Sequence, residues 1–174
     1  MIDLGKKIMI IGSGGSGKST LALQLGEILK LPVIHLDKEF WNPGWIATPK
    51  EEWHEKQRHF MSGSEWIADG NFSGSLEIRL EQTDSIIFLD FNRVTCIYGV
   101  IKRWLTNYGK TRPTMAKECP EKIDFEFLKW IWQFPSTSRP NIMKKISNHK
   151  NLKLFVIKNR KEIKQFIEEV SPTV

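Results

Sequence analysis

A glycine-rich octapeptide near the start of the chain carries the clearest chemical signal. Residues 12–19 read Gly-Ser-Gly-Gly-Ser-Gly-Lys-Ser and match the P-loop spacing G-x-x-x-x-G-K-[ST]. The glycines let backbone N–H groups turn inward around a phosphate, and the following helix adds its positive end. Lys18 is expected to reach the β- and γ-phosphates, and Ser19 to bind Mg²⁺. A ligand-free turn is the alternative. The predicted nucleotide-binding residues are Gly12, Ser13, Gly14, Gly15, Ser16, Gly17, Lys18, Ser19 and Thr20.

Three aspartates stand at the predicted carboxyl ends of strands, where ligands gather in open α/β sheets. Asp69 ends an apolar strand before a glycine, so it is the candidate acidic partner of Mg²⁺, with a turn cap as the alternative. Asp37 could face Mg²⁺ or take a proton from an acceptor hydroxyl. Asp90 is interpreted as structural, because it could cap the next helix. His35, in the same predicted strand as Asp37, is expected to be a core histidine.

Phosphoryl transfer also needs cations that neutralise charge on the transferring group. Arg103 lies near the end of a predicted helix, and Arg112 lies in the aperiodic stretch 107–122. This stretch is expected to be an exposed loop, long enough to close over the nucleotide as a lid spanning about 103–122. Arg79 is a candidate for gripping an acidic acceptor. A surface charge is the alternative for all three arginines.

Seven tryptophans are many for a chain of 174 residues, and two of them occupy a suggestive place. Trp41 and Trp45 lie in a Pro- and Gly-rich segment after Asp37, where an acceptor would dock and where no regular structure is expected. Their rings could stack on a planar or sugar substrate. Trp130 and Trp132 follow a helical pattern and are predicted to be core residues.

The elements that must position these residues alternate between strands and helices. Apolar runs predict strands at 7–11, 33–37, 65–69, 85–90 and 152–157. Helical spacing and caps predict helices at 19–29, 49–61, 76–81, 93–106, 124–134, 140–148 and 159–170. Thr48 with Glu51, and Asn159 with Glu162, have the spacing of capping boxes. Right-handed crossovers then give a three-layer α/β fold of the P-loop NTPase class, with a five-stranded parallel sheet and helices on both faces.

Composition limits the class of protein. An apolar fraction of 40% and a charged fraction of 26% are ordinary for a globular domain and argue against disorder and membrane residence. The chain has no apolar run of about 18 residues, and its first residues lack the regions of a signal peptide, so a cytoplasmic protein is expected. Cys96 and Cys119 form no C-x-x-C pair, which argues against zinc and disulfides. We expect a single domain over 1–174.

Charge is unevenly distributed along the chain. Residues 1–90 hold 9 Lys and Arg against 13 Asp and Glu, a net charge of −4, whereas residues 91–174 hold 17 against 7, a net charge of +10. A basic second half predicts an anionic partner for part of the surface, either nucleotide phosphates or nucleic acid. A solvated lysine-rich face is the alternative.

The motifs together resemble a known family. The P-loop, Asp37, the Asp69-Gly pair and an arginine-bearing lid look like the adenylate-kinase-like branch of small P-loop kinases. More narrowly, segments 10–20, 35–37, 41–45, 66–74 and 112–116 resemble the FlaR-related DNA topology modulation proteins, and the likeness covers nearly the whole chain. The motifs that carry this narrower likeness include Trp-Asn-Pro-Gly-Trp at 41–45 and Arg-Pro-Thr-Met-Ala at 112–116.

The resemblance implies a nucleoside-monophosphate-kinase-like fold with ATP as donor and Mg²⁺. It also implies that Asp37 lies near the acceptor, Asp69 near the metal, and Arg103 and Arg112 on the lid. In one respect this chain departs from many nucleoside monophosphate kinases: Asn-Phe-Ser-Gly follows the Asp69-Gly pair, where those kinases have Phe-Pro-Arg. An AMP acceptor is therefore disfavoured.

Three functional hypotheses remain open at the level of the sequence. The first is a kinase that transfers the γ-phosphoryl of ATP to an unidentified hydroxyl or phosphate acceptor, and it accounts for the P-loop, the acidic strand ends, the lid and the aromatic segment together. The second is a nucleotide-dependent DNA-binding regulator, which the basic second half favours. The third is a non-catalytic nucleotide-binding module.

Overall fold

The computed structural model describes residues 2–170, so residues 1 and 171–174 of the expected domain lie outside the described part. Five parallel strands form its main sheet in the order β2-β5-β1-β6-β7. Four of the predicted strands shorten by one or two residues. The bounds are β1 (Lys7–Gly12), β2 (Val33–His35), β5 (Trp66–Asp69), β6 (Ser85–Leu89) and β7 (Lys153–Ile157).

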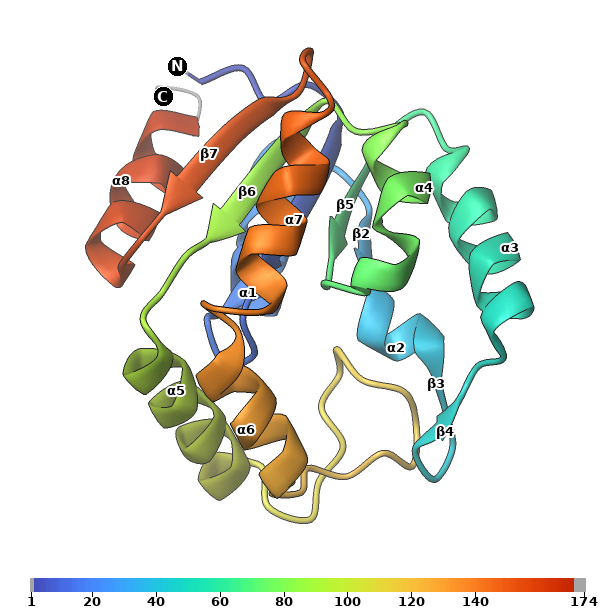
Figure 1. Ribbon diagram of the computed structural model, residues 1–174, viewed down its shortest axis with the longest axis vertical. Coiled ribbons are helices and arrows are strands. Elements are labelled where there is room, and N and C mark those ends of the chain that lie inside the picture. Colours follow the sequence, from blue (N-terminus) through green and yellow to red (C-terminus); the bar gives the residue numbers. More distant parts are fainter. Residues whose placement is uncertain (1, 171–174) are drawn as a thin grey trace.

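Alternation along the central strand divides the core into two halves. Ile8 and Ile10 pack on one face of the sheet, and Met9 and Ile11 pack on the other. The first face is covered by α1 (Lys18–Leu29), α5 (Arg93–Thr106) and α8 (Arg160–Val170), and the second by α3 (Lys50–Met61), α4 (Leu76–Leu80) and α7 (Ser138–Ser147). Figure 1 shows helices on both sides of the strands. The predicted three-layer fold is confirmed.

The segment after β2 differs from its prediction. The strand ends at His35, and Asp37 lies in the first turn of a short helix, α2 (Leu36–Phe40), instead of in the strand. The Pro- and Gly-rich segment that follows is a small antiparallel hairpin of β3 (Trp41–Asn42) and β4 (Ile46–Ala47), where no regular structure was expected.

Side-chain caps fix where several helices begin. The Asn92 side chain accepts from the Thr95 N–H (2.9 Å) and caps α5, and Asp124 caps α6 (Phe125–Gln133). Asn159 caps α8 as predicted, and Glu162 reaches back to the Lys158 N–H. The predicted box at Thr48 is wrong, because the Thr48 hydroxyl donates to the Phe40 carbonyl (2.5 Å) and α3 begins without a side-chain cap.

The helix α5 has the predicted length, but helical spacing along 93–106 indicates an apolar stripe of Val94, Ile97, Tyr98, Ile101 and Leu105, which does not match its buried face. Cys96 and Val100 face the core, whereas Val94, Tyr98 and Leu105 are exposed.

Within the described part of the chain, no helix has both the length and the apolar character needed to cross a membrane.

The loop 107–122 is irregular, as predicted, but it is only partly exposed. Met115, Ala116 and Cys119 are buried, and they pack against Trp41 and Trp45. The Gly44 N–H donates to the Glu118 carbonyl (3.1 Å), and the Cys119 thiol donates to the Asn42 carbonyl (3.3 Å). The loop is therefore docked on the β3–β4 hairpin, which places both beside the carboxyl ends of the strands (Figure 1).

Candidate active site

The P-loop connects β1 to α1 and is pressed against α5. Gly15 has a φ of +76°, and a Cβ there would lie 2.1 Å from the Cys96 carbonyl oxygen. From the other side, a Cβ on Gly99 of α5 would lie 2.3 Å from the Gly15 carbonyl oxygen. Within the loop, the Ser16 hydroxyl donates to the Ser13 carbonyl (2.8 Å). Glycine is therefore required on both sides of this backbone contact.

Lys18 folds back over the loop that precedes it. Its Nζ donates to the carbonyl oxygens of Gly12 (3.0 Å) and Ser13 (2.9 Å). The surrounding protein lowers the pKa of Lys18 below its usual range by removing water, while nearby Asp37 and Asp69 oppose this change. A phosphate group would offer the ammonium an anionic partner in the same place.

Asp69 is buried between a hydroxyl and an imidazole. It accepts a hydrogen bond from the Ser19 hydroxyl (2.6 Å), and its other oxygen lies 2.5 Å from His35 Nδ1. His35 and Asp69 are register partners in β2 and β5, which explains the contact. His35 is thus largely buried, with a side chain 11% exposed, and its ring nitrogen has a partner in Asp69, in agreement with the expectation of a core histidine.

The Ser19 and Asp69 pair fits Mg²⁺. This ion keeps several waters and needs only one or two protein oxygens together with substrate phosphates. A dedicated cage is not required, and among residues 2–170 no group of three or more His, Cys, Asp or Glu side chains is arranged to hold a metal ion. The hydroxyl and the carboxylate are the oxygen ligands that a P-loop magnesium site uses.

Asn71 was missed by the sequence reasoning. Its side chain forms a reciprocal pair with Gly12, accepting from the Gly12 N–H (3.0 Å) and donating to the Gly12 carbonyl (2.7 Å). The pair ties the turn after β5 to the P-loop. The only sequence signal was its position, directly after the Asp69-Gly pair.

The structure corrects the role expected of Arg79. This side chain is 0% exposed and reaches neither cavity described below, so it does not grip an acceptor. Its guanidinium donates to the carbonyls of Gly70 (2.9 Å), Asn71 and Phe72 (3.1 Å). Burial lowers the pKa of Arg79 to about 9, which still leaves it charged at neutral pH. Arg79 therefore shapes the turn behind Asp69.

Asp90 is structural, as interpreted from the sequence, but its partner is different. Both of its oxygens bind Arg139, at 2.8 Å from Nε and 2.7 Å from Nη2. This pair joins the end of β6 to α7 and raises the pKa of Arg139 through the hydrogen bond to Asp90. Asn92 takes the capping role instead.

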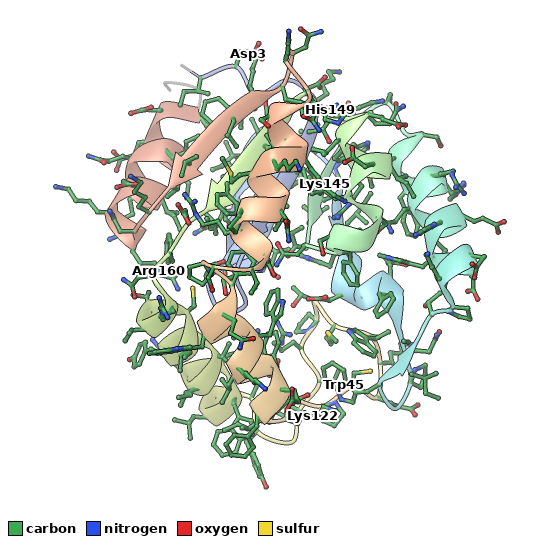
Figure 2. All side chains as sticks on the ribbon, in the orientation of Figure 1. Asp3, Trp45, Lys122, Lys145, His149 and Arg160 are labelled. Atoms are coloured by element: carbon green, nitrogen blue, oxygen red, sulfur yellow. The ribbon has the colours of Figure 1, made fainter. Side chains whose placement is uncertain are left out.

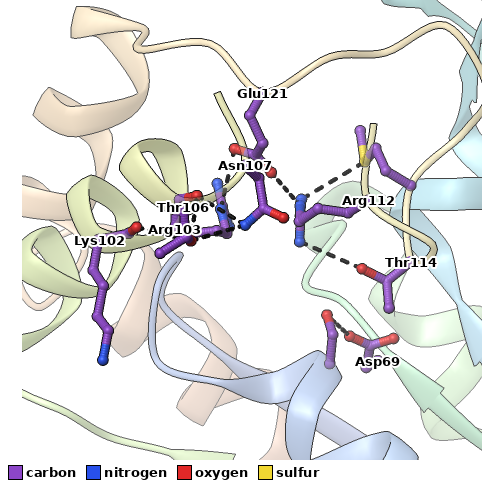
Figure 3. Close-up of polar contacts among 10 residues, drawn as sticks. Asp69, Lys102, Arg103, Thr106, Asn107, Arg112, Thr114 and Glu121 are labelled. Carbon is purple, nitrogen blue, oxygen red and sulfur yellow. Dashed lines mark hydrogen bonds and ion pairs between the residues drawn. The ribbon is translucent and has the colours of Figure 1, made fainter. Parts of the chain in front are cut away.

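Arg103 and Arg112 are brought together by a residue that the sequence analysis did not single out. Glu121 binds Arg103 through one oxygen (3.2 Å from Nε) and Arg112 through the other, as Figure 3 shows. Partial burial and the neighbouring Arg112 charge lower the pKa of Arg103. The two arginines come from α5 and from the loop, so Glu121 joins these two segments, while the lid itself stays a prediction.

Two adjoining cavities open at the carboxyl ends of the strands. The first, of about 450 Å³, contains the P-loop, and the second, of about 300 Å³, contains Trp41 and Trp45. Both cavities share five lining residues: Asp37, Phe72, Arg103, Arg112 and Phe127. Most of the predicted site residues therefore lie around one connected space. The exceptions are Arg79, Asp69 and three residues of the P-loop, Gly12, Ser13 and Ser16, which line neither cavity; Asp69 lies behind the lining residue Ser19, from whose hydroxyl it accepts a hydrogen bond.

Asp37 stands at the junction of the cavities. Its surface is exposed to the cavity space, while the protein around it displaces much of the bulk water and raises the pKa of the carboxyl. The Lys18 charge opposes this rise. Because cavity water still reaches the carboxylate, we expect it to be ionised at neutral pH and able to accept a proton.

Further residues of the first cavity come from helices that the sequence reasoning did not connect with the site. Phe127 and Trp130 of α6 stack with ring centroids 5.7 Å apart and line the cavity. Trp130 also packs against both core clusters, as predicted. Arg160, at the start of α8, lines it from the end of β7 and lies over the Phe91 ring. Figure 2 shows Arg160 between the sheet and α5. Trp132 is half exposed and lies under Arg93.

Comparisons with known proteins identify the fold. The chain is similar to shikimate kinase from Bacteroides thetaiotaomicron, with 17% identity, a TM-score of 0.55 and 94% of each chain covered. It is also similar to shikimate kinase from Acinetobacter baumannii in complex with shikimate, with 12% identity, a TM-score of 0.64 and coverage of 95% of this chain and 90% of that one.

A gluconokinase from Sinorhizobium meliloti is a further similar structure, with 13% identity, a TM-score of 0.58 and coverage of 97% of this chain and 91% of that one. No protein-family model and no curated protein matches the chain. At these low identities the likeness establishes the fold alone. The chain has the fold of small P-loop kinases.

Proposed function

We propose that this chain is a phosphotransferase that moves the γ-phosphoryl group of Mg-ATP to a hydroxyl group of a small-molecule acceptor. The observation that carries the proposal is the junction of the two cavities at Asp37, Arg103 and Arg112. One cavity has the residues that hold phosphates, and the other has aromatic walls. The residues needed for transfer lie between them.

The first cavity suits the nucleotide. Backbone N–H groups of residues 13–17 would surround the phosphates, since the Gly12 N–H already donates to Asn71, and Lys18 would move from the P-loop carbonyls to the β- and γ-phosphate oxygens. Ser19 and Asp69 would hold Mg²⁺. When bound, this ion would neutralise negative charge on the phosphate oxygens.

At the junction, the acceptor hydroxyl attacks the γ-phosphorus. A new bond forms between the acceptor oxygen and phosphorus, the bond from phosphorus to the oxygen that bridges to the β-phosphate breaks, and ADP leaves. Asp37 accepts the hydroxyl proton. Arg103, together with Lys18, stabilises negative charge on the transferring group, and the docked loop excludes water that would otherwise compete as acceptor.

The narrower resemblance to the FlaR-related DNA topology modulation proteins stays a proposal. It is supported by the placement of its motifs, since 41–45 and 112–116 both contribute residues to the second cavity.

The basic second half also favours a second candidate function, DNA binding. If duplex DNA is a partner, its affinity should fall steeply between 50 and 200 mM salt, by about a thousandfold or more for 6–10 phosphate contacts. Salt-insensitive or undetectable binding would dismiss this candidate.

Lys18→Ala tests the kinase proposal. The change removes the P-loop ammonium group that would stabilise negative charge on the transferring γ-phosphoryl group. Transfer from Mg-ATP should therefore fall by at least about a hundredfold. Lys164→Ala, which removes an exposed lysine of α8, is the matched control and should transfer normally. Circular dichroism and thermal melting establish that both variants are folded. Undiminished transfer by a folded Lys18→Ala protein would refute the assigned role.

A further inference from the structure

Glu121 is the most enclosed carboxylate of the second cavity. Its side chain is 5% exposed, whereas Asp37 and Asp124 of the same cavity are exposed. Backbone contacts hold it in place, since its N–H donates to the Lys110 carbonyl (3.1 Å) and the residue forms a β-bridge with Tyr108. Glu121 thus fastens the end of the loop to its beginning and delivers a negative charge into the cavity wall.

The Glu121 carboxylate forms ion pairs with both arginines of the cavity. One oxygen binds Arg103 and the other binds Arg112 (Figure 3). The Arg112 Nη atoms lie near Thr114 Oγ1 (3.4 Å) and Met115 Sδ (3.9 Å), so the loop's own residues surround this guanidinium. Within the described residues Arg103 has no side-chain partner besides Glu121, which leaves its Nη groups for the γ-phosphoryl at the junction.

The remaining charges of the second cavity also balance. Its lining contains three acidic and three basic side chains. Lys122 is exposed, and its Nζ lies 4.9 Å from the centre of the Trp45 ring, as Figure 2 indicates by their adjacent positions. The exposed Asp124 offsets it. An anionic acceptor entering this cavity would have to compete with a buried Glu121 for its counter-ion, at the cost of an unpaired charge.

The walls of the cavity favour a different kind of molecule. Trp41 and Trp45 face each other edge to face at 5.4 Å, and Phe72, Met115 and Phe127 complete an apolar lining. Aromatic side chains bind the apolar face of a ring well. A volume of about 300 Å³ is at the small end of ligand sites, which suits a compact molecule.

We propose that the second cavity selects an uncharged hydroxyl compound with a compact ring, and that Glu121 sets this preference by neutralising Arg103 and Arg112. As a statement about the acceptor, the inference rests on the proposed function. As a statement about which molecules the cavity binds, it can be tested without turnover.

The test uses two probes that differ in charge but hardly in shape, 4-(hydroxymethyl)benzamide and 4-(hydroxymethyl)benzoate. Each is titrated calorimetrically into the protein, with and without Mg²⁺ and a non-hydrolysable ATP analogue. We expect the amide to bind at least about fivefold more tightly than the carboxylate. Equal affinities, tighter binding of the benzoate, or no binding of either probe would overturn the proposal.

Glu121→Gln provides the second arm. Because the change gives the cavity one additional positive charge, the preference for the amide should fall by at least about tenfold. A role of Glu121 limited to holding the loop would weaken both probes equally and leave the ratio unchanged, which would contradict the proposal. Glu118→Gln removes an exposed charge from the same loop and should leave the ratio as it is.

The two proposals fail in different ways. If the nucleotide analogue does not bind, or if no acceptor is phosphorylated, the proposed function fails, while the ratio of the two probes still decides the selectivity of the cavity. If transfer occurs only to carboxylate or phosphate compounds, the kinase proposal stands and the role of Glu121 is wrong. Should Glu121→Gln fail to fold in a thermal melt, the wild-type ratio alone decides.

Discussion

At the scale of single residues, the protein surrounds several charged groups with structure that removes water from them. Lys18 and Asp37 have pKa values moved in opposite directions by this loss of water, Lys18 downward and Asp37 upward, and each opposes the shift of the other. Both changes disfavour the charged form. Such an arrangement is costly in the absence of a ligand, and functional sites are where it is commonly found.

Asp37→Asn separates the base from the binding residues. The amide cannot accept the hydroxyl proton, so transfer should fall by at least about a hundredfold while the affinity for ATP changes little. In the proposed mechanism Asp37 acts as a base only when ionised, and burial raises its pKa. The rate of transfer should therefore increase with pH through a value above the usual aspartate range and level off above it. A rate that keeps its full value in Asp37→Asn, measured with saturating substrates, would remove Asp37 from the mechanism.

Arg79→Met tests the corrected role of a fully buried arginine. The three carbonyls of residues 70–72 would lose their donor inside the protein, which should lower the free energy of unfolding by about 3–5 kcal/mol. Urea titration measures the difference. Arg79→Lys keeps the charge but loses the planar set of guanidinium N–H donors, so the free energy of unfolding should fall by an intermediate amount. A change below about 1 kcal/mol in Arg79→Met would show that the hydrogen bonds contribute little net stability.

At the scale of elements, the contact between the P-loop and α5 links phosphate binding to the position of Arg103. Two glycine backbones meet there, one from each element. The helix that carries Arg103 is consequently aligned by the loop that is proposed to hold the phosphates. Gly99 lies on the same helix, one turn before Arg103.

Gly99→Ala should disturb both elements. Its Cβ would meet the Gly15 carbonyl at 2.3 Å, and the neighbour is backbone, so α5 or the P-loop must shift. We expect a loss of about 1–3 kcal/mol in stability, as for other overpacked sites, together with weaker ATP binding. Gly74→Ala is the control, since a Cβ there has no neighbour within 4 Å. Thermal melting and ATP titration compare the stability and the ATP affinity of the two variants. Equal values for Gly99→Ala and Gly74→Ala would contradict the importance of this contact.

A comparison of the elements with their predictions shows which parts of the fold could be predicted from the sequence. The five strands and most helices follow apolar periodicity, which depends on neighbours a few residues away. The β3–β4 hairpin was missed because its strands have two residues each, and because Trp41 and Trp45 find their packing partners in the distant Met115 and Cys119. Asp37 was placed in a strand because nothing in its local pattern indicates that β2 ends at His35.

The candidate site was predictable where it follows a contiguous motif and unpredictable where it depends on tertiary contacts. Lys18, Ser19 and Asp69 could be named because a P-loop and a strand end occur in order. Glu121 and Asn71 could not, since their importance arises from partners 9 to 59 residues away. Arg79 was misjudged because a buried arginine has the same local sequence as an exposed one.

At the scale of the whole molecule, the site is closed by segments that touch each other as well as the core. The loop 107–122 rests on the hairpin, and Glu121 joins its end to α5 through Arg103. Movement of the loop would therefore alter the second cavity and both arginines together. Closure of the loop as a lid stays a prediction, and in the structure the loop is docked on the β3–β4 hairpin.

Limited proteolysis examines the lid. Trypsin can cleave after Lys110 and Lys117, which are exposed. When Mg-ATP and an acceptor are present, a phosphate contact with Arg103 should hold the end of the loop in place through Glu121 and slow cleavage in the loop by about tenfold or more. Cleavage after the exposed Lys150, outside the lid, serves as the reference and should keep its rate. Equal rates with and without ligands would argue against closure.

The most direct test of the whole account is the fate of the γ-phosphoryl group of labelled Mg-ATP. The protein is incubated with a panel of nucleosides, nucleoside monophosphates, sugars and ring alcohols, and labelled products are separated from inorganic phosphate. The account predicts a labelled organic phosphate with at least one uncharged hydroxyl compound, and its loss in Lys18→Ala. Label that appears only as inorganic phosphate across the panel, or an organic product that persists in Lys18→Ala, would contradict it.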